Sequence, residues 1–305
     1  MARLVRLTMM TVETKLEPMA KRRAELLALL DEAGRAGTDI VLMPERADHH
    51  RTVEALEAGS KGKEAVREVL GLTLESPWMM EVRARARKHK MVVVPSIVLC
   101  EGEKTFGAAP VFGTDGELLG IYNKTHLAPG EERVFDFGGH LDPIQTPFGK
   151  VGIFICWDVH FPEVTRVYEL KGAEILLWST MRHGPWEREF FQTILPGRCL
   201  THGMPLGVAT FSEEEQVAKR AAMNSVIYDA FGQVAAGGLR GGSGLVCGTV
   251  DLELRPVMNR EYGSAEFLDY PKYVAERRRV ELYGVLGERS RNSEFGIRNE
   301  DGTAG

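Results

Sequence analysis

The sequence predicts an α/β protein in which helices cover a mixed sheet or two sheets. Strand-like and helical segments alternate through the first third of the chain, two hairpin-like segments follow them, and no short repeat is present. The 305 residues are 44% hydrophobic and 27% charged, a composition typical of globular proteins. This length predicts one large domain or two fused halves.

The chain begins with a predicted strand, helix and strand. Residues 2–10 alternate apolar and polar side chains, which is typical of a strand. Residues 19–33 follow Pro18 and carry apolar side chains at helical spacing. Residues 39–43 form a short, continuous apolar run, which predicts a buried parallel strand.

A second helix and strand follow a charged segment. Residues 52–74 are charged and interrupted by glycines, which indicates a helix with a surface loop. Ser76 and Pro77 are the capping residue and first-turn proline that a helix over residues 78–90 requires. The apolar residues 91–100 then predict a second buried strand.

The rest of the chain starts with two predicted hairpins, over residues 105–124 and 140–158. We expect further helices at residues 161–172 and 186–201, and further strands at residues 174–179, 205–211, 223–234 and 244–253. Residues 271–286 predict a basic helix, and residues 293–305 are polar. The helix with its Arg277–Arg279 run is interpreted as an interface or salt-bridged face.

Composition excludes several function classes. The net charge of −5 argues against a nucleic-acid partner, which normally requires a basic domain. No apolar run approaches the ~18 residues of a membrane span, and the N-terminus has no signal-peptide core, so we expect a cytoplasmic protein. The four cysteines form no CxxC pair and the histidines have no ligand spacing, which predicts no metal site.

Three reactive residues lie at or just beyond the carboxyl ends of predicted strands, where open α/β sheets bind ligands: Glu45, Lys124 and Cys156. Because Cys156 starts a turn into a helix, the N–H groups there would favour its thiolate. Position alone leaves other interpretations open. A cysteine that ends an apolar strand is more often a packed apolar side chain, and a lysine that ends a hairpin is usually solvated.

Three sequence blocks together resemble the signature of the nitrilase superfamily of carbon–nitrogen hydrolases. They are Leu-Met-Pro-Glu at residues 42–45, Tyr-Asn-Lys-Thr-His-Leu at residues 122–127, and Gly-Ile-Phe-Ile-Cys-Trp-Asp at residues 152–158. The blocks occur in the family's order, and the resemblance extends over most of the chain. It implies a four-layer α-β-β-α sandwich, which we expect to form one domain over residues 1–285, followed by a tail over residues 286–305.

The resemblance also implies a Glu-Lys-Cys triad, which we assign to Glu45, Lys124 and Cys156. An auxiliary glutamate is expected in the loop after the lysine, where spacing favours Glu132 and Glu131 is the alternative. The Lys124 ammonium and the backbone N–H of Trp157 are the expected donors to the substrate oxygen. No cofactor is implied, and a homodimer or higher homo-oligomer is expected.

We expect the substrate pocket to include Trp157, His160, Arg182 and Trp186, with Arg182 as a possible carboxylate anchor. His126 is interpreted as a residue that supports the lysine loop. His49 and His50 follow Glu45 closely, and either line the pocket or belong to a solvated loop.

The implied reaction is hydrolysis of a small amide or N-carbamoyl (ureido) compound through a cysteine thioester. Asp158 stands where true nitrilases usually have Glu, which favours these substrates over nitriles. The alternatives are a nitrilase, a catalytically silent binding member of the family, and a Cys-His hydrolase that uses His126 or His160. We do not expect a glutaminase fused to a synthetase, because 305 residues leave no length for the partner domain.

Overall fold

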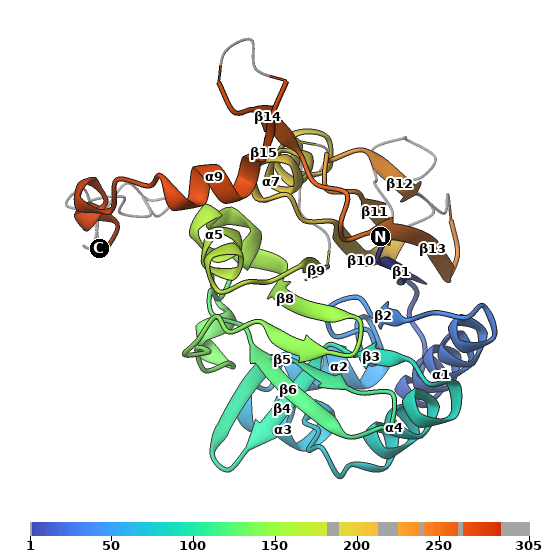
Figure 1. Cartoon of the computed structure of the whole chain (residues 1–305). Helices are drawn as coiled ribbons and strands as arrows, with labels where there is room; N and C mark the ends of the chain where they lie inside the picture. Colours follow the sequence, from blue (N-terminus) through green and yellow to red (C-terminus); the bar gives the residue numbers. More distant parts are fainter. Residues whose placement is uncertain (1, 182–188, 213–224, 238–240, 262–264, 288–305) are drawn as a thin grey trace. The chain divides into compact units, whose positions relative to one another are not determined.

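The computed structural model describes all residues except 1, 182–188, 213–224, 238–240, 262–264 and 288–305 (Figure 1). The chain divides into two compact units, Met1–Pro271 and Lys272–Gly305. No helix among the described residues combines the length and the apolar character needed to cross a bilayer.

Thirteen strands among the described residues of the first unit form two sets, which are the two sheets of the structure. The first set consists of β1 (Leu4–Glu13), β2 (Ile40–Leu42), β3 (Val92–Val94), β4 (Ile97–Glu101), β5 (Lys104–Phe112), β6 (Leu118–Asn123) and β13 (Gly244–Asp251). The second consists of β7 (Ile144–Thr146), β8 (Gly149–Ile155), β9 (Ile175–Ser179), β10 (Leu206–Ser212), β11 (Val226–Tyr228) and β12 (Val234–Gly237). The sets join where the end of β1 pairs in parallel with the end of β10.

Alternating side chains give each sheet two buried faces. Val5, Leu7 and Met9 of β1 pack in one core cluster with Ile153 and Leu177 of the second sheet. Met10 and Val12 of the same strand pack in another cluster with helix residues. Because successive strand residues point to opposite faces, the continuous apolar runs predicted from sequence match strands that are buried on both sides.

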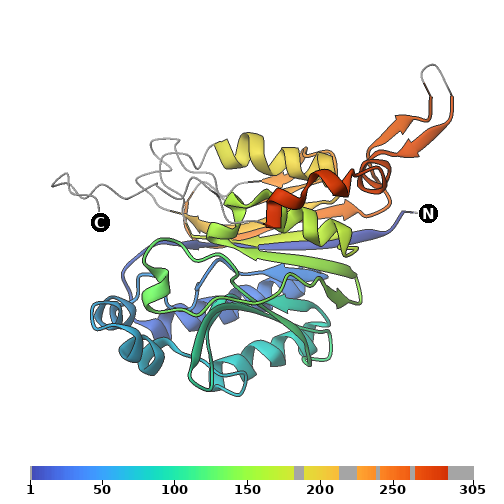
Figure 2. The same ribbon diagram turned by 90° about the vertical axis from the view of Figure 1, so that its left-hand side faces the viewer.

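Helices cover the outer faces of both sheets. Helices α1 (Met19–Arg35) and α4 (Pro77–His89) pack on the first sheet, and α5 (Pro162–Leu170) and α7 (Leu195–His202) pack on the second. Figure 2 shows the two sheets between these helical layers. The predicted four-layer α-β-β-α sandwich is therefore confirmed.

Several elements differ from those predicted. The strand expected over residues 91–100 is interrupted at Pro95, which has no N–H for a ladder, and becomes β3 and β4. The charged segment at residues 52–74 contains two helices, α2 (Val53–Gly59) and α3 (Lys63–Leu70).

The C-terminal half also differs. A turn in which the Asp229 carboxylate accepts bonds from the N–H groups of Phe231 and Gln233 divides the strand expected over residues 223–234 into β11 and β12. The basic helix ends early: α9 spans Tyr270–Glu276, and short 3-10 turns follow at Val280–Leu282 and Gly284–Gly287. The hairpin of β14 (Val257–Asn259) and β15 (Phe267–Asp269) was not predicted.

Candidate active site

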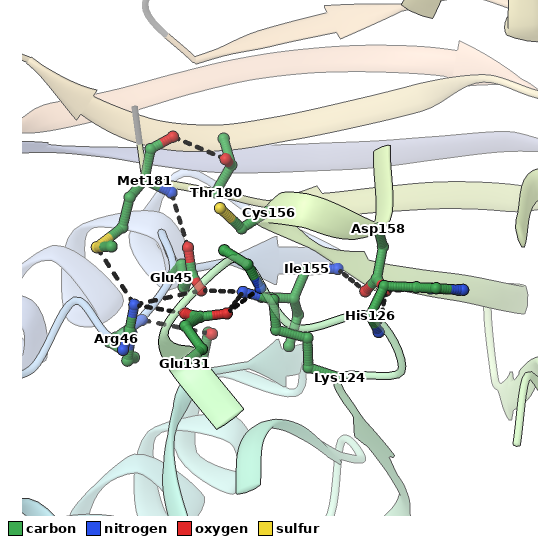
Figure 3. Close-up of polar contacts among 12 residues, drawn as sticks. Glu45, Arg46, Lys124, His126, Glu131, Ile155, Cys156, Asp158, Thr180 and Met181 are labelled. Atoms are coloured by element: carbon green, nitrogen blue, oxygen red, sulfur yellow. Dashed lines mark hydrogen bonds and ion pairs between the residues drawn. The ribbon is translucent and has the colours of Figure 1, made fainter. Parts of the chain in front are cut away.

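Glu45, Lys124 and Cys156 come together from three elements, as Figure 3 shows. Glu45 follows β2, Lys124 follows β6, and Cys156 begins a 3-10 turn (Cys156–His160) directly after β8. All three side chains are buried, with exposed fractions of 2%, 1% and 8% respectively. The carboxyl ends of strands in both sheets therefore supply one cluster.

Both oxygens of the Glu45 carboxylate are held. The Lys124 ammonium donates to Oε1 at 3.1 Å, and the backbone N–H of Met181, just after β9, donates to Oε2 at 3.1 Å. The Cys156 thiol lies beside this carboxylate, and each of the two groups shifts the pKa of the other (Figure 3). Glu45 is thus hydrogen-bonded to Lys124 and is a neighbour of Cys156.

Glu131, rather than Glu132, contacts Lys124. The ammonium donates to Glu131 Oε2 at 2.6 Å, and the backbone N–H of Ala128 donates to the same oxygen at 2.8 Å. Gly130 has a left-handed backbone (φ 90°) and starts a short 3-10 turn that directs Glu131 inward and leaves Glu132 exposed. Spacing in the sequence favours Glu132 as the auxiliary glutamate, but Glu131, the alternative, is the one that contacts Lys124.

Arg46 completes the charged cluster, and the sequence analysis missed it. Its guanidinium lies 3.1 Å from Glu131 Oε1 and 3.6 Å from Glu45 Oε1. Two carboxylates, one ammonium and one guanidinium therefore balance in charge, which offsets much of the cost of burying them. In the sequence, only the position of Arg46 directly after Glu45 could have indicated that it belongs to this cluster.

Neighbouring charges set the protonation states. Burial would raise the pKa of Glu45, but the Lys124 ammonium and the Arg46 guanidinium lower it to about 2. Burial would lower the pKa of Lys124, but the Glu45 carboxylate and its other anionic neighbours hold it above its ordinary value. The resting cluster therefore contains a Glu45 carboxylate and a Lys124 ammonium.

Cys156 rests as a thiol. Burial, followed by the Glu45 carboxylate, raises the pKa of this thiol well above its ordinary value, and the Lys124 ammonium opposes them only in part. The N–H groups of the turn, which the sequence analysis expects to favour a thiolate, are opposed by burial and the Glu45 carboxylate. A base must therefore remove the proton when Cys156 reacts, and the Glu45 carboxylate lies beside it.

The turn that carries Cys156 is fixed from both sides. Cys156 has a left-handed backbone (φ 45°), which is rare for a residue other than glycine and often found at functional sites. Its carbonyl accepts a hydrogen bond from the indole of Trp178 at 3.2 Å. The Asp158 carboxylate accepts a hydrogen bond from the Ile155 N–H at 2.8 Å, directly before the cysteine.

Asp158 also connects this turn to the lysine loop. Its fully buried carboxylate accepts hydrogen bonds from the Tyr122 hydroxyl at 2.6 Å and the His126 N–H at 2.9 Å, on either side of Lys124. The His126 ring contacts the same carboxylate and stacks on Phe161. His126 therefore supports the loop, as predicted, while this role of Asp158 was missed.

The other expected pocket residues are only partly described. The half-buried Trp157 packs against His160, which is exposed and also contacts the ring of Phe190. Arg182 and Trp186 lie outside the described residues. Residues His49 and His50 line a cavity of about 250 Å³ together with Arg46 and Met181.

The described residues contain no group of three His, Cys, Asp or Glu side chains that could hold a metal ion. All four cysteines are free thiols.

Comparison with known proteins finds one family model and several relatives. The family model described as carbon-nitrogen hydrolase matches residues 3–257. A citrullinase of Francisella tularensis is 28% identical over 61% of this chain and 67% of its own length. An omega-amidase of Danio rerio is 27% identical over 61% of this chain and 66% of its own.

An N-carbamoylputrescine amidase of Arabidopsis thaliana is 32% identical over 39% of this chain and 44% of its own. The alignments cover about two thirds of the citrullinase and of the omega-amidase, and less than half of the N-carbamoylputrescine amidase.

Solved structures share the fold. A carbon-nitrogen hydrolase of Helicobacter pylori superposes with a TM-score of 0.72 at 20% identity, covering 94% of this chain and 99% of that one. A mutant amidase of Nesterenkonia, covalently modified by fluoroacetamide at its active-site cysteine, superposes with a TM-score of 0.69 at 21% identity, over 92% and 95% of the two chains.

Proposed function

The chain belongs to the carbon–nitrogen hydrolase family of the nitrilase superfamily, and we propose that it is a thiol hydrolase of small amide or N-carbamoyl compounds. One observation carries this proposal: a buried thiol on a left-handed turn lies beside a carboxylate that an ammonium holds ionised. The triad is Glu45, Lys124 and Cys156, and the bond cleaved is a non-peptide C–N bond.

Acylation begins with proton transfer from the Cys156 thiol to Glu45. The sulfur attacks the planar carbon of the substrate, and its oxygen becomes an oxyanion. The Lys124 ammonium and the backbone N–H of Trp157 stabilise that charge, and removing one such donor typically lowers turnover by ~10²–10³. Glu45 returns the proton to the nitrogen, the C–N bond breaks, and ammonia or an amine leaves a thioester on Cys156.

Hydrolysis of the thioester repeats the cycle with water. Glu45 takes a proton from water, the hydroxide attacks the thioester carbon, and the C–S bond breaks as the proton returns to sulfur. Glu131 holds the Lys124 ammonium in place through both half-reactions. Arg46 neutralises the charge of Glu131 and so lowers the cost of burying a second carboxylate beside Glu45.

Relatives support the substrate class. The omega-amidase supports an amide, and the N-carbamoylputrescine amidase supports an N-carbamoyl compound. A nitrilase remains the alternative enzyme, because the same sulfur attack converts a nitrile carbon. A silent binding member is the second alternative, although it would usually lack one residue of the triad.

The first experiment measures ammonia release from a panel of amides, N-carbamoyl compounds and nitriles. Hydrolysis of amides or N-carbamoyl compounds supports the proposal, and release from nitriles alone would identify a nitrilase. Thiol labelling tests the silent alternative: a reactive Cys156 without turnover on any of these classes would favour a binding protein. Cys100, Cys199 and Cys247 serve as internal controls for labelling.

The second experiment tests the triad. Cys156→Ala and Cys156→Ser should keep the fold and bind substrate but lose turnover, and Lys124→Met should lower kcat by ~10²-fold or more. Lys171→Met is the matched control, because Lys171 pairs with Asp142 at the surface. Near-normal hydrolysis by Cys156→Ala would exclude the mechanism.

We also propose that the chain assembles as a homodimer or a higher homo-oligomer. Exposed leucines on the outer helices support this: Leu170 of α5 is 45% exposed and Leu200 of α7 is 43% exposed. Sedimentation of the purified chain, with Leu170→Asp and Leu200→Asp for comparison, tests the assembly.

A further inference from the structure

A cavity beside the triad is not used by the mechanism above. Its volume is about 250 Å³, which about eight water molecules would fill. It shares Arg46 and Met181 with the catalytic cluster: the Arg46 guanidinium pairs with Glu131, and the Met181 N–H donates to Glu45 (Figure 3). The cavity therefore adjoins Glu45 and Glu131, while Cys156 and Lys124 are not among its lining residues.

Much of the cavity wall is apolar. It is formed by side chains of α2, α3, β4 and the loop after Glu131, namely Ala55, Val66, Leu70, Val98, Val134 and Phe135. This wall suits a methylene chain, because burying apolar surface is favourable wherever no polar group is left unpaired.

The polar part of the lining is cationic or neutral. It consists of Arg46, His49, His50 and Arg51, and no Asp or Glu is among the described residues that line the cavity. The acids that contact lining residues are already paired: Asp48 with Arg23 and His49, and Glu45 and Glu131 with Lys124 and Arg46. No described lining group is therefore suited to pair with a cationic ligand.

Arg51 is the cation available to a ligand. Arg46 is committed to Glu131, whereas Arg51 is exposed and forms no ion pair within the described part of the chain. Arg51 also has a left-handed backbone (φ 52°), which is rare for a residue other than glycine. His50 contributes a neutral ring, since burial and the Arg46 guanidinium lower its pKa to about 3.

We propose that this cavity binds the part of the substrate remote from the reacting carbon, and that it selects an apolar chain ending in a carboxylate. This inference rests on the proposed function and names the substrate class within it. The methylene chain contacts the apolar wall, and the Arg51 guanidinium binds the carboxylate at the far end. A chain ending in an ammonium is disfavoured because the described lining offers it cations and no carboxylate.

Three amides of equal chain length test the selection: glutaramate, pentanamide and ω-aminopentanamide. They share the reacting amide and differ only at the far end. We expect kcat/KM for ammonia release to be highest for glutaramate, by about tenfold over pentanamide, and lowest for ω-aminopentanamide. An ammonium-ended amide that matches or exceeds glutaramate would overturn the inference.

Variants of Arg51 locate the effect. Arg51→Gln should reduce the preference for glutaramate over pentanamide about tenfold, mainly through a higher KM, while Arg51→Lys should keep part of it. Arg87→Gln is the matched control, since Arg87 is exposed on α4 and does not line the cavity, and it should leave the preference unchanged. An unchanged preference in Arg51→Gln would contradict the assignment.

The two proposals fail in different ways. If neither these amides nor N-carbamoyl compounds of the same chains release ammonia, the proposed function fails. If they are hydrolysed without regard to the charge at the far end, only the inference about the cavity fails.

Discussion

At the scale of single residues, four charged groups determine what Cys156 can do. A lone Glu45 in this environment would tend to be protonated, because burial disfavours its charge. Lys124 and Arg46 reverse that tendency, and Glu131 compensates the second cation. The base is therefore ready before substrate arrives, while the nucleophile is still protonated.

We predict that Glu131→Gln lowers kcat/KM by at least about tenfold, because the Lys124 ammonium loses its 2.6 Å partner and Arg46 is left with one carboxylate. Glu132→Gln is the matched control, since the neighbouring side chain is exposed, and its kcat/KM should stay within about twofold. Steady-state hydrolysis of the best substrate from the panel measures both. A larger loss in Glu132→Gln than in Glu131→Gln would contradict the assignment.

A second prediction concerns the thiol itself. The Glu45 carboxylate raises the pKa of Cys156 and the Lys124 ammonium lowers it, so Glu45→Gln should shift that pKa downward. Ultraviolet absorbance of the thiolate, titrated against pH with Cys156→Ser as the blank, measures the shift. A pKa that stays in place or rises in Glu45→Gln would show that the carboxylate does not act on the sulfur.

At the scale of secondary-structure elements, Asp158 holds two catalytic segments in a fixed position relative to each other. It joins the 3-10 turn of Cys156 to the loop of Lys124 through buried hydrogen bonds to Ile155, Tyr122 and His126. Each hydrogen bond to a charged group contributes about 1.5–3 kcal/mol, so the turn and the loop are fixed together.

We therefore predict that Asp158→Asn lowers the free energy of unfolding by about 2–4 kcal/mol, because the amide cannot accept all of these bonds. It should also lower kcat more than it raises KM, since the displaced groups act on the reacting atoms. Urea unfolding and steady-state kinetics measure the two effects. Asp142→Asn is the control, because Asp142 is a surface partner of Lys171, and an equal effect there would contradict the prediction.

Local patterns predicted most elements but not their interruptions. Apolar runs predicted β2, β8 and β9 correctly. Both faces of these strands are buried, so nearly all of their residues are apolar and the run is easy to recognise in the sequence. The division of residues 223–234 into β11 and β12 depends on hydrogen bonds to the Asp229 side chain. The spacing of apolar residues does not predict such bonds.

The sequence also predicted the main residues of the site but not all of their neighbours. The family blocks pointed to Glu45, Lys124 and Cys156, but Glu131 and Glu132 differ only in which one the turn after Gly130 directs inward. That direction is a property of backbone geometry, and sequence spacing favoured the wrong glutamate.

At the scale of the first unit, the cluster draws its groups from both sheets of the sandwich. Glu45 and Lys124 come from the first sheet, and Cys156 and the Met181 N–H come from the second. The Ser179 hydroxyl donates to the Met43 carbonyl at 2.8 Å and so links the two sheets beside Glu45. Unfolding separates these groups, and hence the pKa shifts they cause in one another contribute to the pH dependence of stability.

We predict that the protein loses stability as the pH falls below about 6.5, and that His50 accounts for part of the loss. Burial and then the Arg46 guanidinium lower the pKa of His50 from 6.5 to about 3. Between those values the unfolded chain binds a proton that the folded chain excludes, so acid favours unfolding. At pH 5 this contribution reaches at most about 2 kcal/mol, from 1.36 kcal/mol per pKa unit.

His50→Gln tests this prediction, because glutamine removes the titrating group and keeps a polar side chain at the cavity wall. The free energy of unfolding in urea, measured at pH 7 and pH 5, should fall less between the two values in His50→Gln than in the parent chain. Glu45 does not explain a difference in this range, since its pKa shift from 4.5 to about 2 acts only at lower pH. An equal fall in both proteins would mean that His50 titrates normally in the folded chain, and that the cavity beside the triad is more polar than its lining indicates.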